Sequence, residues 1–129
     1  MADGWLMRWV GEYERAWRTP GTHVLGELFT PDVTYLPSPF EEPVRGLDAL
    51  ASFWDSERVG PGEAFTLRAW PVAVEGRSGV ARAHVDYHGP RPRSYRDLWV
   101  VVIAADGRCR HFEEWPFHPA RPRVAAPPA

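Results

Sequence analysis

The first apolar segment of the chain has the period of an amphipathic helix. Between residues 5 and 17, apolar side chains recur three or four positions apart, with charged residues between them, at Leu6, Trp9, Tyr13, Ala16 and Trp17. The Thr-Pro-Gly sequence at 19–21 ends this helix. A shorter helix is expected next, capped by Thr22 and continuing through Phe29 until Pro31 stops it. The pattern therefore predicts two helices before the first strand.

The next segment predicts a short strand followed by a third helix. Residues 33–36, Val-Thr-Tyr-Leu, have the composition of a strand. The prolines at 37, 39 and 43 favour an extended loop or a sheet edge, because proline cannot donate a ladder hydrogen bond. The helix is expected to begin after Gly46, with helically spaced apolar residues at Leu47, Leu50, Ala51, Phe53 and Trp54. The Gly-Pro-Gly sequence at 60–62 is expected to close it.

From residue 65 onward the pattern changes to strands. Four are predicted, at 65–74, 79–88, 95–104 and 109–116, separated by turn residues at Gly76, 89–92 and Asp106-Gly107. Helices first and a run of strands afterwards is an α+β order, since alternating units would predict a parallel sheet. We therefore expect a curved antiparallel sheet wrapped around the N-terminal helices.

The stretch from Leu98 to Ala105 is apolar at both odd and even positions. An antiparallel strand with one face in water would alternate apolar and polar residues instead. Both faces of the sheet are therefore expected to be covered, one by helices and a pocket and the other by a second subunit in a homodimer.

The length of 129 residues fits one domain, which we expect over residues 1–118. Hydrophobic residues make up 44% of the chain and aromatic residues 13%, with 7 Trp, which is enough to form a core. Residues 119–129 are rich in proline and alanine and are expected to form a loose surface tail.

The charge distribution argues against a nucleic-acid partner. There are 15 basic and 17 acidic residues, a net charge of −2, and no basic block that would bind a phosphate backbone. No apolar run approaches the ~18 residues of a membrane span, and the first residues lack the pattern of an export signal. The sequence thus predicts a cytoplasmic protein without a membrane partner.

The residue types present restrict the possible chemistry. Every basic residue is arginine, and lysine, asparagine and glutamine are absent. A lysine Schiff base and a side-chain amide in an oxyanion site are therefore excluded. The lone Cys109 is expected to be a buried strand thiol. Acid–base chemistry must come from aspartate, glutamate, histidine or tyrosine, and no cofactor is expected.

Two carboxyl groups are predicted to meet on the last hairpin. If Asp106-Gly107 forms a two-residue turn, Trp99 lies opposite Glu114 and Asp97 opposite Pro116. Asp97 and Glu114 then share a face with Trp99 and Phe112. Apolar surroundings would raise the pKa of a carboxyl there and leave it as a general acid or base near neutral pH.

Two alternatives stay open for these acids. A type I turn with a bulge would shift the pairing by one residue and place Glu113, rather than Glu114, opposite Trp99. The acids could also lie at a rim or pair with an arginine such as Arg96 or Arg110.

A second polar cluster lies on the preceding predicted strand. His84, Asp86 and His88 alternate on one face, a spacing that could hold a metal ion. The opposite face carries the better core stripe: Ala81, Ala83, Val85 and Tyr87. The polar face is therefore expected to contact solvent or the second subunit, and no metal site is assigned.

The aromatic residues suggest a pocket for a flat, apolar ligand. Seven tryptophans are more than a core of this size requires, and ring-rich walls suit such ligands. The candidates for ligand contact are Trp17, Trp54, Trp99 and Phe112. Tyr13 lies one helical turn from Trp9 and from Trp17, and could donate a hydrogen bond to a ligand carbonyl, or could be a core tyrosine.

Four segments together resemble the nuclear transport factor 2-like superfamily, in particular its SnoaL-like and ketosteroid-isomerase-like members. They are the helix at residues 9–17, Leu-Phe-Thr-Pro-Asp-Val-Thr-Tyr at 28–35, Pro-Val-Arg-Gly-Leu-Asp-Ala-Leu at 43–50, and the hairpin from Asp106 to Trp115. The resemblance covers residues 5–118. It implies a cone-shaped α+β barrel, related to the cystatin fold, with a hydrophobic pocket at its open mouth.

The resemblance also bears on the site. It implies that the face holding Asp97 and Glu114 points into the pocket, and that Tyr13 corresponds to the hydrogen-bonding tyrosine of the ketosteroid isomerases. Their general base would fall at Pro37-Ser38 and their second acid near Trp99, so ketosteroid isomerisation itself is not expected.

The sequence therefore supports two functions almost equally. One is an isomerase or cyclase that binds a small apolar molecule and removes a proton next to a carbonyl, with Asp97 or Glu114 as the base and Tyr13 stabilising the enolate oxygen. The other is a non-catalytic ligand-binding or dimeric interaction module.

Overall fold

The computed structural model describes residues 4–58 and 64–119, which form three helices and six strands. In chain order these are α1 (Trp5–Arg18), α2 (Leu25–Leu28), β1 (Phe29–Leu36), β2 (Val44–Arg45), α3 (Leu47–Glu57), β3 (Ala64–Glu75), β4 (Ser78–Gly89), β5 (Arg93–Ile103) and β6 (Cys109–Phe117). The predicted α+β order is confirmed. The Gly-Pro-Gly sequence at 60–62 and most of the predicted tail lie outside the described residues.

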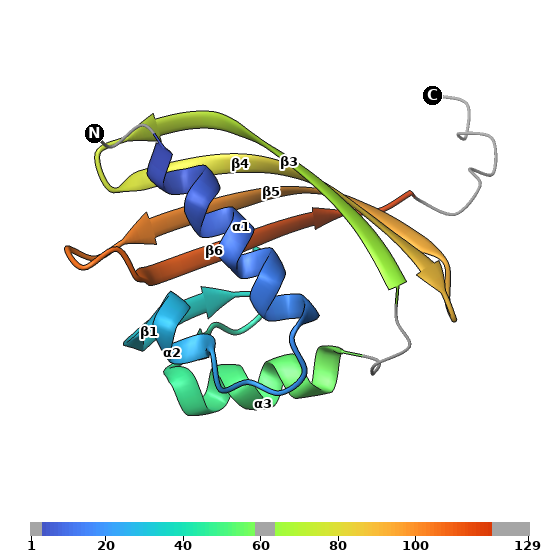
Figure 1. The fold of residues 1–129 in the computed structure, drawn as a ribbon, viewed down its shortest axis with the longest axis horizontal. Helices are drawn as coiled ribbons and strands as arrows, with labels where there is room; N and C mark the ends of the chain where they lie inside the picture. The colour runs from blue at the N-terminus through green and yellow to red at the C-terminus, as the bar shows by residue number, and fades with distance from the viewer. Residues whose placement is uncertain (1–3, 59–63, 120–129) are drawn as a thin grey trace, which may run out of the picture.

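The six strands form one curved sheet in the order β2-β1-β6-β5-β4-β3 (Figure 1). The strands β3 to β6 are antiparallel to their neighbours, as predicted. The pairing of β1 with β6 is parallel, so the sheet is mixed rather than wholly antiparallel. Since β2 and β3 lie at its two edges, the sheet does not close into the barrel that the resemblance implied.

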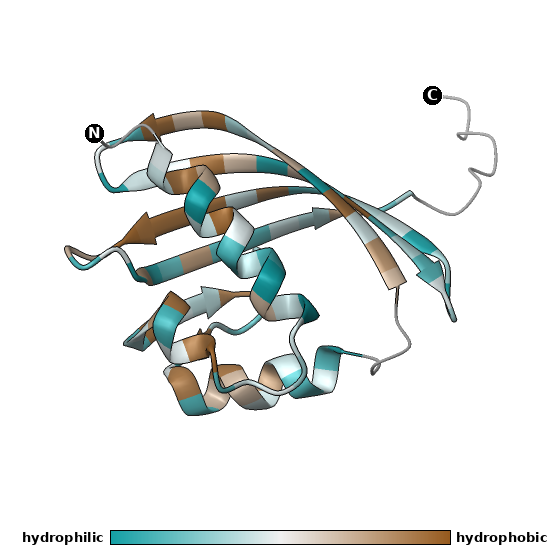
Figure 2. Ribbon diagram, in the orientation of Figure 1, coloured by the Kyte–Doolittle hydropathy of each residue, from teal (hydrophilic) through white to brown (hydrophobic). Residues whose placement is uncertain are grey.

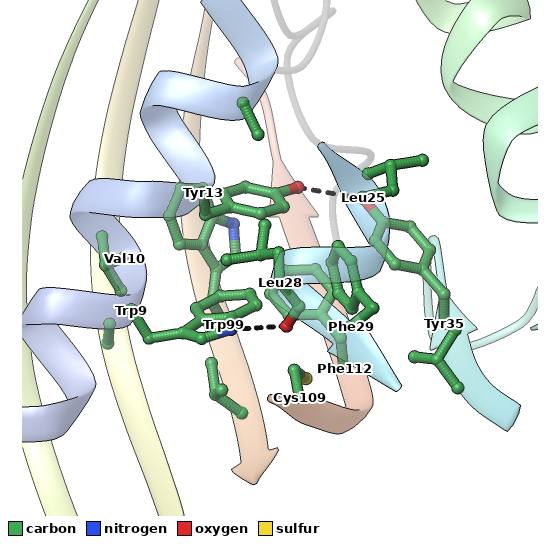
Figure 3. Packing of buried hydrophobic residues seen from close by; sticks show 14 of the residues in the cluster. Trp9, Val10, Tyr13, Leu25, Leu28, Phe29, Tyr35, Trp99, Cys109 and Phe112 are labelled. Carbon is green, nitrogen blue, oxygen red and sulfur yellow. Dashed lines mark hydrogen bonds between the residues drawn. The ribbon is translucent and has the colours of Figure 1, made fainter. Parts of the chain in front are cut away.

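The helix α1 lies across the inner, concave face of the sheet, and α3 lies beside β1 (Figure 1). The apolar stripe of α1 is buried, as the periodicity predicted. Its buried residues are Trp5, Leu6, Trp9, Val10, Tyr13 and Ala16. Figure 3 shows the centre of this core, where the Trp9 ring stacks on Tyr13 and its Nε1 donates a hydrogen bond of 3.1 Å to the Leu28 carbonyl. The side chains of α1 thereby tie the helix to the turn before β1.

The predicted helix from Thr22 to Pro31 is wrong in extent. The helix α2 covers four residues only, and β1 begins at Phe29 rather than at Val33. Phe29 pairs with Cys109 of β6 and is completely buried. Pairing and burial of this residue in the sheet outweigh the local helical spacing that predicted otherwise.

The hairpin between β5 and β6 keeps the predicted register but not the predicted turn. The Gly107 N–H donates to the Ala104 carbonyl at 3.0 Å and the Ala104 N–H donates to the Arg108 carbonyl at 2.8 Å, so the loop contains three residues, 105–107, instead of two. Near it, Ile103 pairs with Cys109, one residue away from the predicted pairing. One position further along, Val102 pairs with His111, which leaves Arg110 as an extra residue in β6. This bulge restores the predicted pairing of Trp99 with Glu114.

The outer face of the sheet carries an apolar patch. Alternate residues of β5 point away from α1, because successive side chains of a strand face opposite sides. With neighbouring strands they form the outer patch: Val80, Leu98, Val100, Val102, Trp115 and Phe117. Trp115 and Phe117 are exposed in the single chain. Figure 2 shows the apolar stretch at the C-terminal end of β5. The strand β5 thus presents apolar side chains on both faces of the sheet, and the covering of the outer face by a second subunit stays a prediction.

The helices in the described parts of the chain include none that is long and apolar enough to cross a membrane. The cytoplasmic location remains a prediction from the sequence.

The contact between α1 and β4 gives a test of the packing. Gly79 lies on the inner face of β4, where an added Cβ would lie 3.0–3.2 Å from atoms of Leu6 and Trp5. We expect Gly79→Ala to lower the free energy of unfolding by about 1–3 kcal/mol in urea denaturation, because overpacking displaces α1. The control is Gly11→Ala in α1, where the added methyl has no neighbour within 4 Å. It should raise the free energy of unfolding by about 0.5–1 kcal/mol. Equal effects of the two substitutions would contradict this packing.

Candidate functional site: a carboxyl pair in the cone pocket

A pocket of about 240 Å³ opens beside the C-terminal halves of α1 and α3. Its other walls are formed by residues of the sheet strands β1, β3, β4, β5 and β6. An apolar cavity of about 150 Å³ can hold benzene. The pocket therefore has room for a molecule with one or two rings.

The pocket wall combines aromatic rings with carboxyl groups. The rings belong to Tyr13, Trp17, Tyr35, Phe53, Phe65, Tyr87, Tyr95 and Trp99. The carboxyl groups belong to Glu14, Glu41, Glu57, Asp97 and Glu114. Among the described lining residues, Arg93 is the one basic side chain. Such a wall offers apolar contact on most sides and concentrates negative charge at a few points.

Asp97 and Glu114 are neighbours on the pocket wall, where β5 and β6 pair. Asp97 is 3% exposed, and its Oδ2 accepts a hydrogen bond of 3.1 Å from Trp99 Nε1. The other oxygen, Oδ1, is buried and accepts no hydrogen bond from a permanent donor. The adjacent Glu114 carboxyl can supply that hydrogen when it is protonated. The geometry thus fits two carboxyl groups that share one proton.

The surroundings assign that proton to Glu114. Burial raises the pKa of Glu114 well above its usual range, and the nearby charge of Asp97 raises it further. Burial raises the pKa of Asp97 as well, but hydrogen bonds from Glu114 and Trp99 oppose that rise. Asp97 is therefore the carboxyl that ionises first and Glu114 the one that keeps its proton longer, which supplies a base and an acid side by side.

Tyr13 and Tyr35 form a second hydrogen-bonded pair in the wall. Their hydroxyl oxygens lie 2.9 Å apart and are buried (Figure 3). Burial raises the pKa of both hydroxyls, and the neighbouring Glu114 raises it further. Both therefore stay protonated. Because one hydroxyl donates to the other, the proton of the accepting hydroxyl remains available to a third group.

The structure brings together most of the residues predicted for the site. Asp97, Glu114, Tyr13, Trp17 and Trp99 all line the pocket. Trp54 and Phe112 do not; both are completely buried behind the wall. Trp54 packs edge-on against Trp17 at 4.7 Å, and Phe112 stacks on Tyr35 at 4.9 Å. These two rings support the pocket-lining rings instead of contacting the pocket.

Sequence reasoning missed Tyr35 and the acids from the helices and loop, Glu14, Glu41 and Glu57. Tyr35 carried a usable signal, since its alternation with Val33 places both on the inner face of β1. The three glutamates carried none, because exposed glutamates near helix ends are common and their convergence depends on the tertiary fold.

The structure has the register that pairs Trp99 with Glu114, not the alternative with Glu113. Among the described residues, no arginine pairs with Asp97 or Glu114. Glu113 points outward, where its carboxylate bonds His111 Nε2 at 2.8 Å and Trp115 Nε1 at 2.9 Å. Arg96 pairs with Asp86, at 3.3 Å. In the described parts of the chain, no ion pair involves Asp97 or Glu114.

The three polar residues of β4 have separate partners. His84 packs on the Trp70 ring, the Asp86 carboxylate pairs with Arg96, and His88 Nε2 lies 2.7 Å from Thr66 Oγ1. Within residues 4–58 and 64–119, no group of three or more potential ligands could hold a metal ion. The outward position expected for this face is confirmed.

Cys109 is completely buried in β6, which confirms the prediction of a buried strand thiol. Burial raises its pKa to about 12, so the thiol stays protonated near neutral pH and is a poor nucleophile.

Comparisons with known proteins identify the family and the fold. Residues 10–112 match a protein family described as the SnoaL-like domain. The comparison with curated proteins finds no match. Among solved structures, SalBIII, described as an epoxide hydrolase/cyclase-like enzyme in pyran ring formation of the polyether salinomycin, is 15% identical with a TM-score of 0.72. The alignment covers 86% of this chain and 89% of the SalBIII chain.

Two further structures share the fold. An NTF-2 like protein from Burkholderia xenovorans LB400 is 14% identical with a TM-score of 0.70, over 96% of this chain and 91% of its own. A CaMKII hub from S. rosetta is 19% identical with a TM-score of 0.67, over 88% of this chain and 95% of its own. The resemblance predicted from sequence is thus confirmed for the family and the fold.

The buried pair makes a prediction for stability. Because the pKa of Glu114 is raised by folding, the unfolded chain loses this proton first, and stability falls as pH rises above the ordinary glutamate pKa of about 4.3. The glutamine in Glu114→Gln does not ionise, so the variant has no such pH-dependent loss of stability at this position. We expect it to raise the free energy of unfolding at pH 7–8 by about 0.5–2 kcal/mol, measured by urea denaturation, with a smaller gain at pH 4.

The neighbouring residue provides the control. Hydrogen bonding to His111 lowers the pKa of Glu113, so its contribution to stability is present above the ordinary pKa and is lost as pH falls. Glu113→Gln should therefore give no gain at pH 7–8. A Glu114→Gln protein that is less stable than the wild type at this pH would argue against a buried, protonated Glu114.

Proposed function

Because the chain belongs to the SnoaL-like domain family, we propose that it binds a small ring-containing metabolite in its cone pocket and acts on it by proton transfer. The reaction class is isomerisation or ring closure. The observation that carries the proposal is the pairing of a charged Asp97 with a protonated Glu114 in an aromatic pocket. Fold alone would not suffice, since the same fold serves unrelated functions.

In the isomerase reaction, Asp97 takes the proton from the carbon next to a ligand carbonyl. The electrons move onto the carbonyl oxygen, where the free hydroxyl proton of the Tyr13–Tyr35 pair donates a hydrogen bond to the developing charge. Once Asp97 has taken the carbon-bound proton, it no longer needs the Glu114 proton, which is then free to donate to the same oxygen. Asp97 then returns the proton to a different carbon. The aromatic walls exclude water and keep the base in a poorly solvated state, which strengthens it.

Ring closure uses the same two carboxyl groups. A base removes the proton of the attacking hydroxyl while an acid protonates the oxygen that leaves. The similar structure SalBIII is described as epoxide hydrolase/cyclase-like and takes part in pyran ring formation, which supports this version. Both versions need one charged and one protonated carboxyl at the same time.

We also propose that the chain forms a homodimer through the outer patch. Two patch residues, Trp115 and Phe117, are exposed in the single chain, and contiguous exposed apolar surface of this kind marks interaction sites. The structural similarity to a CaMKII hub supports assembly by this fold in general.

A neutral bicyclic probe tests the proton transfer. A base that removes the C–H proton of 5-nitrobenzisoxazole breaks its N–O bond and releases a coloured phenolate. We expect the wild type to accelerate this reaction and Asp97→Asn to lower kcat/KM by about 10²- to 10⁴-fold, the usual contribution of a general base. The pH profile should rise as Asp97 ionises, above the ordinary aspartate pKa, because burial raises it.

The outward Glu113→Gln serves as the matched control and should retain the wild-type rate. If the wild type is no faster than Asp97→Asn while both bind the probe, the chain is a non-catalytic binding module, and the enzymatic proposal fails.

The dimer is tested by one substitution in the patch. Val100 lies near its centre, and Val100→Arg places a charge in the proposed interface. We expect a wild-type dimer and a folded Val100→Arg monomer by native mass spectrometry. The control Ser52→Arg, on exposed α3, should remain dimeric. A wild-type monomer at micromolar concentration would overturn the proposal.

A further inference from the structure

We propose that the ligand of the pocket carries a positive charge, such as a protonated or quaternary amine attached to an apolar ring. This inference rests on the proposed function, because it names the ligand class for the same site. It differs from the neutral, apolar ligand that the sequence predicted. Four features of the described residues carry it.

The first feature is the imbalance of charge in the wall. Five carboxyl groups and one guanidinium line the pocket. With one proton shared by Asp97 and Glu114, and with Glu14 neutralised by Arg18 at 2.9 Å, three negative charges remain among the described lining residues, one on the pair and one each on Glu41 and Glu57, against the single positive charge of Arg93. Within the described chain neither of these two forms an ion pair.

The second feature is the position of Glu57. It is the last residue of α3, and the last turn of that helix contains no basic residue. The C-terminal end of a helix carries partial negative charge, so a carboxylate there is repelled. Arg58 follows as the C-cap, but its guanidinium donates to the carbonyls of Thr19 and Gly21. A cation bound in the pocket would therefore be stabilised by the Glu57 carboxylate.

The third feature is the field inside the pocket. After burial, the charges of Asp97, Glu57 and Glu41 raise the pKa of Glu114, and the charge of Glu57 raises the pKa of Tyr35 as well. Glu41 and Glu57 both act on Glu114 from the mouth. This field favours a cation over a neutral molecule of the same shape and repels an anion.

The fourth feature is that aromatic rings of the pocket wall already contact cationic side chains of the protein. The Arg18 guanidinium carbon lies 3.8 Å from the Phe65 ring centre, and that of Arg93 lies 4.0 Å from the Tyr87 ring centre. Both rings line the pocket, so the protein's own cations already use their electron-rich faces. Rings attract an ammonium group in the same way, most strongly where water is excluded.

Three probes of similar size separate the possibilities. Benzyltrimethylammonium carries a fixed positive charge, neopentylbenzene is its neutral isostere, and phenylacetate is an anion. In isothermal titration of the full chain, we expect the cation to bind about tenfold more tightly than the isostere, and the anion to bind more weakly than both. Rising salt should weaken binding of the cation alone.

A charge-matched pair of variants locates the effect. The double variant Glu41→Gln with Glu57→Gln should lower the affinity for benzyltrimethylammonium by about threefold or more and leave that for neopentylbenzene unchanged. The control double variant, Glu12→Gln with Glu42→Gln, removes the same charge from exposed residues outside the pocket wall. It should leave both affinities unchanged.

The outcomes distinguish this inference from the proposed function. Equal binding of the cation and the isostere, or tighter binding of phenylacetate, would overturn the inference and leave the pocket as a ligand site. Equal loss of cation affinity in the two double variants would overturn it too, by showing a general effect of net charge. Failure of all three probes to bind would overturn the inference together with the ligand-binding function on which it rests.

Discussion

The proton between Asp97 and Glu114 determines what the pocket can do. Two carboxylates cannot both be charged at short distance in an aromatic wall, because each ionised group is poorly solvated and repels the other. Trp99 holds Asp97 in the charged form with a hydrogen bond of 3.1 Å, and Glu114 keeps the proton. An acid and a base with separate pKa values therefore lie together in a wall whose described residues include no lysine and no side-chain amide.

The fold reaches this arrangement through backbone features remote from the pocket. The bulge at Arg110 offsets the three-residue loop at 105–107, and without it Glu113 would face inward. The helix α1 covers the inner face with Trp9 and presents Tyr13 one turn later, and β1 supplies Tyr35 through its parallel pairing with β6. The rings behind the wall, Trp54 and Phe112, pack against the pocket-lining rings of Trp17 and Tyr35 and restrict their positions. Stability of the core and orientation of the site are consequently coupled.

Much of this could be predicted from the sequence, for reasons that differ between elements. Periodicity located α1, α3 and the four long strands, since each buries one regular stripe. It failed at Phe29, where local helical spacing competes with burial in the sheet, and for the parallel pairing of β1, which depends on distant residues. The register of Glu114 was predicted through a two-residue turn that the chain does not contain; the bulge happens to restore the same pairing. The acids at the mouth could not be predicted, because three elements far apart in sequence bring them together.

The most direct test of the shared proton is a titration of the side-chain carboxyl carbons by nuclear magnetic resonance in ¹³C-labelled protein. We expect the Asp97 and Glu114 signals to move together in two steps, the upper step well above the ordinary glutamate range, because interacting groups titrate as a pair. In Asp97→Asn the upper step should fall, since the neighbouring charge is gone. Independent single steps for both carboxyl groups near ordinary values would contradict the account.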